Sequence, residues 1–168
     1  MSFLSRIFGK STDDRAAVRP LWHRVVEVAR ERSWYRNGVA DTVPGRFDAI
    51  TMVLALVLLR MEREKSLIAA SARLTELFVD DMDGQLREAG IGDLVVGKHV
   101  GKLMGTLGGR IGALREALPR GEGAVAEVIG RNVSLIDGAE SGPIAREALA
   151  LHARIDALDA EALLAGGF

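Results

Sequence analysis

The sequence contains no cysteine, which excludes disulfide bonds, thiolate metal sites and cysteine nucleophiles. It also lacks an apolar run long enough to cross a bilayer. The longest run, 49–59, has about half of the ~20 residues that a transmembrane helix needs. The first ten residues have no long apolar core and no small-residue cleavage site, so we expect no export signal. Together these absences favour a cytoplasmic location.

Alternating strand patterns are absent too, and apolar residues recur instead with the 3.6-residue period of helices. A chain of 168 residues that is 48% hydrophobic can bury a real core within one domain. We therefore predict an all-α fold, a compact single-domain bundle of about six helices over residues 14–168, after an amphipathic tail at 1–13. The expected helices cover 14–32, 46–64, 66–79 with a continuation through residue 84, 95–118, 121–133 and 143–164, and 37–48 is the clearest loop.

Charge is unevenly distributed along the chain. Residues 1–60 contain 10 Lys and Arg against 6 Asp and Glu, whereas residues 121–168 contain 3 against 8. A basic N-terminal third favours an anionic lipid surface or RNA as a partner. Ordinary solubilising charge explains so small an excess equally well, so both interpretations stay open.

The tail at 1–13 has the composition of a shallow membrane anchor. Its apolar side chains stand beside basic ones: Phe3, Leu4, Arg6, Ile7, Phe8 and Lys10. So short a segment binds a bilayer weakly by itself. Peripheral membrane contact through the tail and docking of the tail on the bundle are the two alternatives.

No set of residues assembles a catalytic site. The segment 92–98 fits the start of a phosphate-binding loop, but His99 stands where that loop needs a hydroxyl residue for Mg²⁺, and no strand precedes it. Asp81 and Asp83 imitate the motif of haloacid-dehalogenase-type phosphatases, but the apolar residues before them have helical spacing. We predict a protein that is not an enzyme and has no catalytic residues.

The three histidines, His23, His99 and His152, are scattered and form no pair with the spacing of metal ligands. Positions on helix surfaces are the expectation, so we predict no metal site and no cofactor. One histidine as a haem ligand is the alternative, which would make this a small helical haem- or ligand-binding protein.

Four glycines, Gly97, Gly101, Gly105 and Gly109, fall at every fourth residue and would line one side of a helix. Each costs about 1 kcal/mol relative to alanine in a helix interior. Contacts that need the missing side chains should offset this cost. Either another helix of the same protein packs closely on this helix-packing groove, or the groove receives a helix from a client protein.

Three blocks together give a specific resemblance. They are WYRNGVADTVPGRFDAITMVLALVLLRM at 34–61, LFVDDMDGQLREAGIGDLVVGKHVGKL at 77–103 and the weaker GRIGALREAL at 109–118. In this order they resemble the ubiquinol–cytochrome c chaperone family, over roughly residues 20–130. That family assists the assembly of cytochrome b into the respiratory bc1 complex.

The resemblance implies an all-helical, non-enzymatic assembly chaperone without a cofactor. Its client would be cytochrome b, nascent or still without haem. Mitochondrial members work with a small partner protein near the ribosome exit, so these are candidate partners here, whereas we expect no specific DNA binding. Because no mitochondrial presequence is visible, we expect a bacterial member in the cytoplasm, peripheral at the cytoplasmic face of the inner membrane.

The family motifs also supply candidate site residues. The first motif is matched by Asp41, Thr42, Gly45, Arg46 and Asp48, and the second by Asp81, Asp83, Arg87, Gly90, Gly92, Asp93 and Lys98. The polar candidates either fix long loops onto the bundle or form the rim of a client site: Asp41, Asp48, Asp81, Asp83, Arg87 and Asp93. We expect Arg46 and Asp48 to pair with charged residues of 81–93.

Residues that contact the client should be exposed, and aromatic residues and arginine are favoured as contact anchors. On this basis the candidates for client or partner binding are Trp34, Tyr35, Arg46, Phe47, Met82 and Lys98.

Overall fold

The computed structural model describes residues 14–88, 90 and 92–168, so the tail predicted at 1–13 lies outside the described residues. The described chain is helical, and its only β pairing is an isolated bridge between Val39 and Leu135. The prediction of an all-α bundle is confirmed. Its elements are α2 (Arg19–Ala29), α3 (Arg32–Arg36), α4 (Val43–Met61), a 3₁₀ turn (Lys65–Leu67), α5 (Ile68–Glu88), α6 (Asp93–Ala117), a 3₁₀ turn (Leu118–Arg120), α7 (Glu122–Asn132), α8 (Gly142–Asp156) and α9 (Ala160–Leu164).

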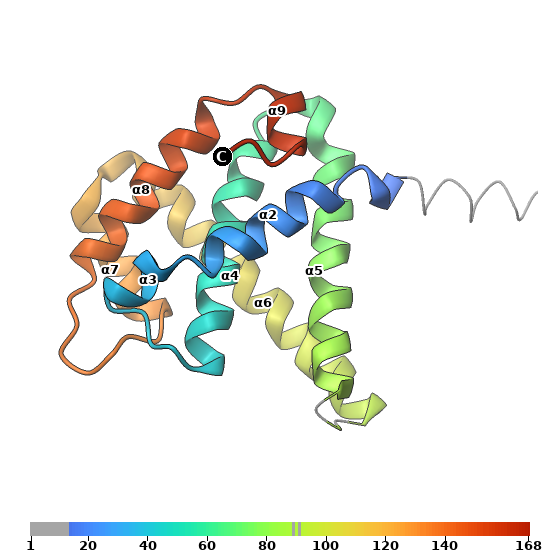
Figure 1. The fold of residues 1–168 in the computed structure, drawn as a ribbon, viewed down its shortest axis with the longest axis horizontal. Coiled ribbons are helices and arrows are strands. Elements are labelled where there is room, and N and C mark those ends of the chain that lie inside the picture. The colour runs from blue at the N-terminus through green and yellow to red at the C-terminus, as the bar shows by residue number, and fades with distance from the viewer. Residues whose placement is uncertain (1–13, 89, 91) are drawn as a thin grey trace, which may run out of the picture.

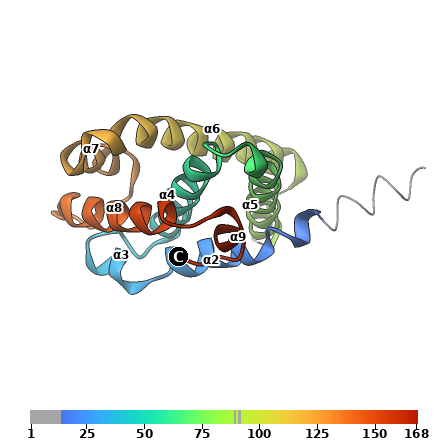
Figure 2. The same cartoon turned by 90° about the horizontal axis from the view of Figure 1, so that it is seen from above.

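The helices form layers around α4 (Figures 1 and 2). Helices α2 and α3 lie on one side of the molecule, and α6 and α7 lie on the other. Between them α4 packs against α2, α6 and α8, while α5 packs against α2 and α6. The outer sides of α2 and α6 therefore point in opposite directions.

Helix α4 is central because it is apolar almost all round. Its residues from Thr51 to Leu59 are all buried. The hydroxyl of Thr42 accepts a hydrogen bond from Gly45 N at 3.2 Å and caps the helix start, and Pro44 sits in the first turn, where its missing N–H costs nothing. The helix therefore begins at Val43, and the predicted loop ends at residue 42.

Two predicted helices are divided in the structure. The one expected at 14–32 ends at Ala29, and extended backbone at Glu31 (φ −58°, ψ 134°) starts α3 in a new direction. The one expected at 143–164 ends at Asp156. A side-chain oxygen of Asp159 then accepts from Ala162 N at 2.8 Å and caps the short helix α9. Neither break contains glycine or proline, which is why periodicity alone missed both.

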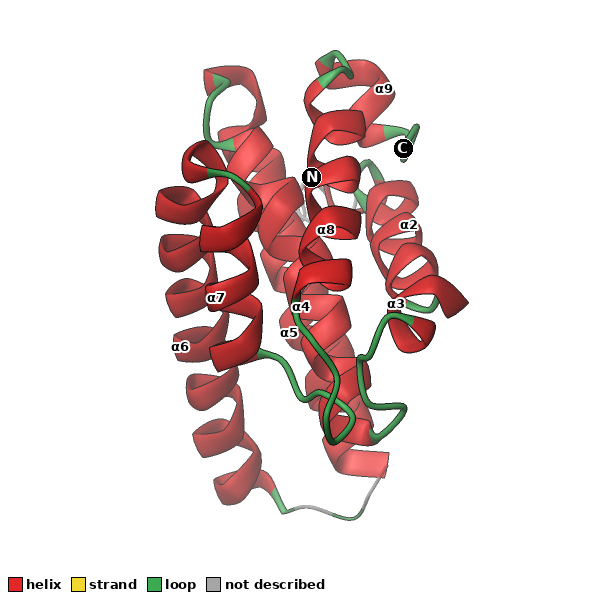
Figure 3. Cartoon of the chain, turned by 90° about the vertical axis from the view of Figure 1, so that its left-hand side faces the viewer, coloured by secondary structure: helices red, strands yellow, loops and turns green. Residues whose placement is uncertain are grey.

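The loop before α4 and the loop between α7 and α8 lie side by side (Figure 3). Ala40 N donates to Ser134 O at 2.9 Å, and Ile136 N donates to Gly38 O at 2.8 Å. Gly45 allows this loop to lie against the first turn of α4, because a Cβ there would stand 1.8 Å from the carbonyl oxygen of Ala40. The glycine of the first family motif is thus required by close backbone approach.

No helix among the described residues has both the length and the apolarity to span a bilayer.

Candidate functional site

A buried ion pair links the two halves of the bundle. The carboxylate of Asp48 on α4 pairs with the guanidinium of Arg110 on α6, and both residues are more than nine-tenths buried. The second carboxylate oxygen of Asp48 accepts from Ser134 N and Ser134 Oγ, each at 2.8 Å. Arg110 also donates to the hydroxyl of Thr51 and, at 2.5 Å, to Asn132 O. Asp48 therefore belongs to an internal polar network and not to an exposed rim.

This network fixes the orientation of α6 on α4. The transfer of two charges from water to the interior is costly, and their mutual attraction repays the cost only when further hydrogen bonds satisfy both groups. Here the Asp48 carboxylate is satisfied by Arg110 and Ser134, whereas Nε of Arg110 has no partner among the described residues. Loss of either charged partner would leave the other charge buried alone.

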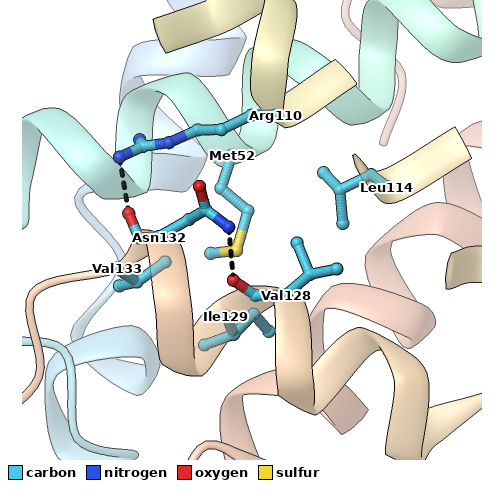
Figure 4. Close-up of a pocket in the computed structure, with 7 residues that line it drawn as sticks. All are labelled: Met52, Arg110, Leu114, Val128, Ile129, Asn132 and Val133. Atoms are coloured by element: carbon cyan, nitrogen blue, oxygen red, sulfur yellow. Dashed lines mark hydrogen bonds between the residues drawn. The ribbon is translucent and has the colours of Figure 1, made fainter. Parts of the chain in front are cut away.

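A small cavity of about 10 Å³ lies beside the network (Figure 4). Its lining comes from α4, α6, α7 and the residue after α7: Met52, Arg110, Leu114, Val128, Ile129, Asn132 and Val133. A cavity of this size holds at most about one water molecule. It has no room for haem or another organic ligand.

Two of the residues predicted to contact the client are buried, so the prediction that they are exposed is wrong. Trp34 is only 1% exposed, and its Nε1 donates to Val28 O at 2.9 Å, which ties α3 to the end of α2. Met82 is 6% exposed and faces the core from α5. The sequence shows that a residue is apolar or aromatic, but only the packing of neighbouring helices decides which of these residues face solvent.

The neighbouring aromatic candidates are half-buried. The Tyr35 hydroxyl donates to Ala29 O at 3.0 Å. Burial raises the pKa of Tyr35, and the charge of Asp41 adds to this rise. The centroid of the Phe47 ring lies 6.3 Å from that of Phe78, and the guanidinium carbon of Arg110 lies 5.9 Å from the centroid of the Phe47 ring. Both residues support the bundle and expose only part of their surface.

The predicted pairing between the loop before α4 and residues 81–93 is wrong. Arg46 is exposed and donates from Nε to Asp41 at 2.7 Å, a contact that raises the pKa of Arg46. Arg87 donates to Asp83 at 2.8 Å within α5. Asp41 and Asp83 thus each pair with an arginine four or five residues away, and Asp48 pairs with Arg110 on α6.

The remaining second-motif residues lie at the end of α5 and the start of α6. Asp81 and Lys98 are exposed, and α6 begins at Asp93, whose side chain lies outside the described part of the structure. Because Asp81 and Asp83 stand inside α5 and residues 93–98 lie inside α6, the strands that a phosphatase or a phosphate loop needs are not there. The described residues also contain no group of His, Asp and Glu placed to hold a metal ion.

The glycines of α6 form an open surface, which we call the glycine face. It consists of Gly97, Gly101, Gly105, Gly108, Gly109 and Gly112. A Cβ built on any of these residues would meet nothing within 4 Å. Of the two alternatives for these glycines, close packing of another helix of this chain is therefore not found among the described residues. The opposite side of α6, with Leu107, Arg110 and Leu114, is the side that is buried.

Comparison with known proteins decides the family. Residues 36–168 match the sequence pattern described as ubiquinol-cytochrome C chaperone. The chain belongs to this family. A crystal structure of the Cbp3 homolog from Brucella abortus is similar to this chaperone at 30% sequence identity, with a TM-score of 0.79 over 98% of this chain and 94% of the other. No curated protein matches the chain.

The match extends the resemblance from about residue 130 to residue 168. That C-terminal region supplies Asn132 and Ser134 to the buried network. Arg110, which the sequence analysis did not select, has a recognisable signal: Leu103, Leu107, Arg110 and Leu114 follow helical spacing, so a lone arginine stands on an otherwise apolar side.

Proposed function

We propose that this chaperone holds newly made cytochrome b on the glycine face of α6 during assembly of the bc1 complex. The observation that carries the proposal is the open glycine face. Family membership supports an assembly role with a client protein. The glycine face supports a client that presents a helix.

The first step of the argument is energetic. Six glycines in an exposed helix cost about 1 kcal/mol each relative to alanine. The total is comparable to the ~5–15 kcal/mol by which a whole domain is stable. No described part of the chain contacts the positions where side chains are missing, so no internal packing offsets this cost. A contact outside the chain is the remaining source of compensation.

The second step is geometric. Where one helix lacks side chains, the backbone of another helix can approach closely, and apolar membrane helices associate in this way. The edges of the glycine face carry exposed Met104 and exposed Val95, so an apolar partner gains hydrophobic contact there. Exposed Lys98 and Lys102 add a polar border. This combination fits an apolar helix of cytochrome b before it reaches its place in the complex.

The third step concerns rigidity. A docking surface is effective when its geometry is already set before binding. Arg110 lies on the buried side of the same helix and anchors α6 to Asp48 and to Asn132. We infer that this anchor presents the glycine face in a fixed orientation.

The site of action follows from the same proposal. Because the client is a membrane protein, we place the chaperone at the cytoplasmic face of the inner membrane, close to the ribosome that makes the client. A small partner protein, as in mitochondrial members of the family, is the proposed second subunit. Asp41 in the loop before α4 and Arg46 in the first turn of α4 form an exposed pair that is available for such a contact.

A crosslinking pull-down from native membranes tests the proposal, with ribosomes present and the full chain tagged. We expect recovery of cytochrome b, and we expect Gly101→Leu combined with Gly105→Leu to abolish it. Gly123→Leu on α7 is the matched control, because Gly123 is also exposed with nothing within 4 Å of its Cβ position. If the double variant and the control recover equal amounts of cytochrome b, the glycine face is not the binding site. If no protein, the native chain included, recovers cytochrome b, then cytochrome b is not the client.

A further inference from the structure

Exposed basic residues are concentrated on α2 and α3. Arg19 and His23 on α2 and Arg30 directly after it are spaced at i, i+4 and i+11, which places them on one side of the helix, and all three are exposed. On α3, Arg32 and Arg36 are four residues apart and exposed. We call Arg19, Arg30, Arg32 and Arg36 the basic face.

These four arginines differ from most others in the chain because none has an ion-pair partner among the described residues. Elsewhere arginines are paired with acids: Arg15, Arg24, Arg46, Arg60, Arg63, Arg73, Arg110, Arg115, Arg131 and Arg146. The only acids in residues 19–36 are Glu27 and Glu31, and Glu27 pairs with Arg24 at 2.9 Å. Within residues 19–36, five arginines therefore stand against two acids.

The side chains around these arginines distinguish between anionic partners. Helices α2 and α3 form the outermost layer on their side of the bundle (Figures 1 and 2), and the four arginines are exposed. Proteins that bind single-stranded nucleic acid use a basic groove with aromatic side chains on which bases stack. Here Trp22 and Trp34 are buried, and the hydroxyl of Tyr35 is bound to Ala29 O. The basic face therefore offers phosphate-binding groups without a fully exposed aromatic ring for base stacking among its described neighbours.

We propose that the basic face binds the anionic phospholipid headgroups of a bilayer. A guanidinium donates two parallel hydrogen bonds to a phosphate, and four exposed guanidiniums on one layer of helices can contact several headgroups at once. Basic residues close to an anionic bilayer each strengthen binding by about fivefold. This inference concerns a different surface from the client site and does not depend on the identity of the client.

The proposal has a geometric consequence for the chaperone. Helix α6 lies on the opposite side of α4 from α2 and α3 (Figure 2). With the basic face on the bilayer, the glycine face points away from the membrane toward the cytoplasm. A client helix would then be held before it enters the bilayer, and the chaperone would not need to release the membrane to receive it.

Vesicle flotation of the full chain tests the proposal directly. The vesicles contain phosphatidylcholine alone or phosphatidylcholine with about one-third phosphatidylglycerol, at low and high salt. The variant replaces Arg19, Arg30, Arg32 and Arg36 with glutamine. The matched control loses the same charge at exposed cations that also lack an ion-pair partner among the described residues: Lys65, Lys102, Arg120 and Arg154, each changed to glutamine.

We expect the native chain and the control to float with the anionic vesicles at low salt and to be released at high salt. We expect the affinity of the basic-face variant to fall by at least about tenfold, since four favourable terms are lost. An equal loss in the control would show that net charge alone acts and would overturn the proposal. Unchanged flotation of the variant, with all binding lost instead on deletion of residues 1–10, would also overturn it.

RNA is the competing partner, and the same variants decide between the two. If the basic-face variant loses co-sedimentation with ribosomes but binds vesicles as the native chain does, the surface is an RNA site and the lipid proposal is wrong. Because all four substitutions are at exposed side chains, thermal unfolding of the variant should match that of the native chain.

Discussion

Replacement of Gly101 and Gly105 by alanine should make this protein more stable and a poorer chaperone. Each glycine lies in the interior of α6, where alanine is favoured by about 1 kcal/mol. A Cβ at either position meets nothing within 4 Å, so no steric cost opposes the gain. The double variant should gain about 1–2 kcal/mol in the free energy of unfolding. For a chain of this length that corresponds to a rise in Tm of about 2–8 °C.

Binding should change in the opposite direction. Two added methyl groups would separate the backbone of α6 from a helix that packs against it, and such overpacking typically costs about 1–3 kcal/mol. We therefore expect the double variant to bind the client helix with an affinity lower by about tenfold or more. The comparison protein is Gly123→Ala, which adds a methyl group to an exposed helix elsewhere.

Urea unfolding followed by circular dichroism measures the stability, and the crosslinking pull-down measures client recovery. Higher stability with lost recovery in the double variant, and unchanged recovery in Gly123→Ala, are the expected pair of results. A destabilised double variant would show that part of the chain packs on the glycines, contrary to the structure. A stabilised variant with full recovery would refute the step from exposed glycines to client binding.

Three further changes test other parts of the structure. Gly45→Ala should destabilise the protein by about 1–3 kcal/mol or more in urea unfolding, because its Cβ would collide with the carbonyl of Ala40; an unchanged midpoint would contradict the close approach. Arg110→Met should cost about 3–5 kcal/mol at neutral pH by leaving a buried carboxylate unpaired, and a cost below 1 kcal/mol would refute the buried network. The hydrogen bond from Arg115 lowers the pKa of Glu62. The ionised Glu62 carboxylate therefore stabilises the folded state at pH values above its unfolded pKa, and this stabilisation is lost as the pH falls through its lower folded pKa. Glu62→Gln should remove that part of the acid dependence in a pH series of thermal unfolding, and an identical pH profile would show that the pair contributes nothing.

The sequence was sufficient for features that depend on neighbouring residues. The uniformly apolar segment around Leu54 identified the central helix, and the glycine spacing correctly placed Gly97 and Gly109 on a single helix. The same reasoning failed to predict which side chains are exposed to solvent. Trp34 and Met82 were expected on the surface, and both are buried in the core of the bundle.

The buried network shows why the site was only partly predictable. The contact between Asp48 and Arg110 joins residues 62 positions apart, and no local pattern connects them. Arg46 was matched to the wrong acids for a different reason: its partner Asp41 is only five residues away, but the acids of the second motif were equally plausible candidates. The sequence shows the helical spacing of Arg110 with its apolar neighbours, but it does not show that Asp48 is the partner of Arg110.

The sequence separation within this network also sets the order in which the fold can form. Ser134 bonds to Asp48 across 86 residues, and Arg110 does so across 62. Closure of loops of this length costs chain entropy before any contact repays it, and topologies with distant contacts fold more slowly than those with local ones. During synthesis the carboxylate of Asp48 on α4 lacks both of its buried partners, Arg110 and Ser134, until α6 and the loop after α7 have left the ribosome. The central helix therefore reaches its final burial late, and slow steps in refolding should respond to changes at Ser134 although that residue lies far from α4 in the chain.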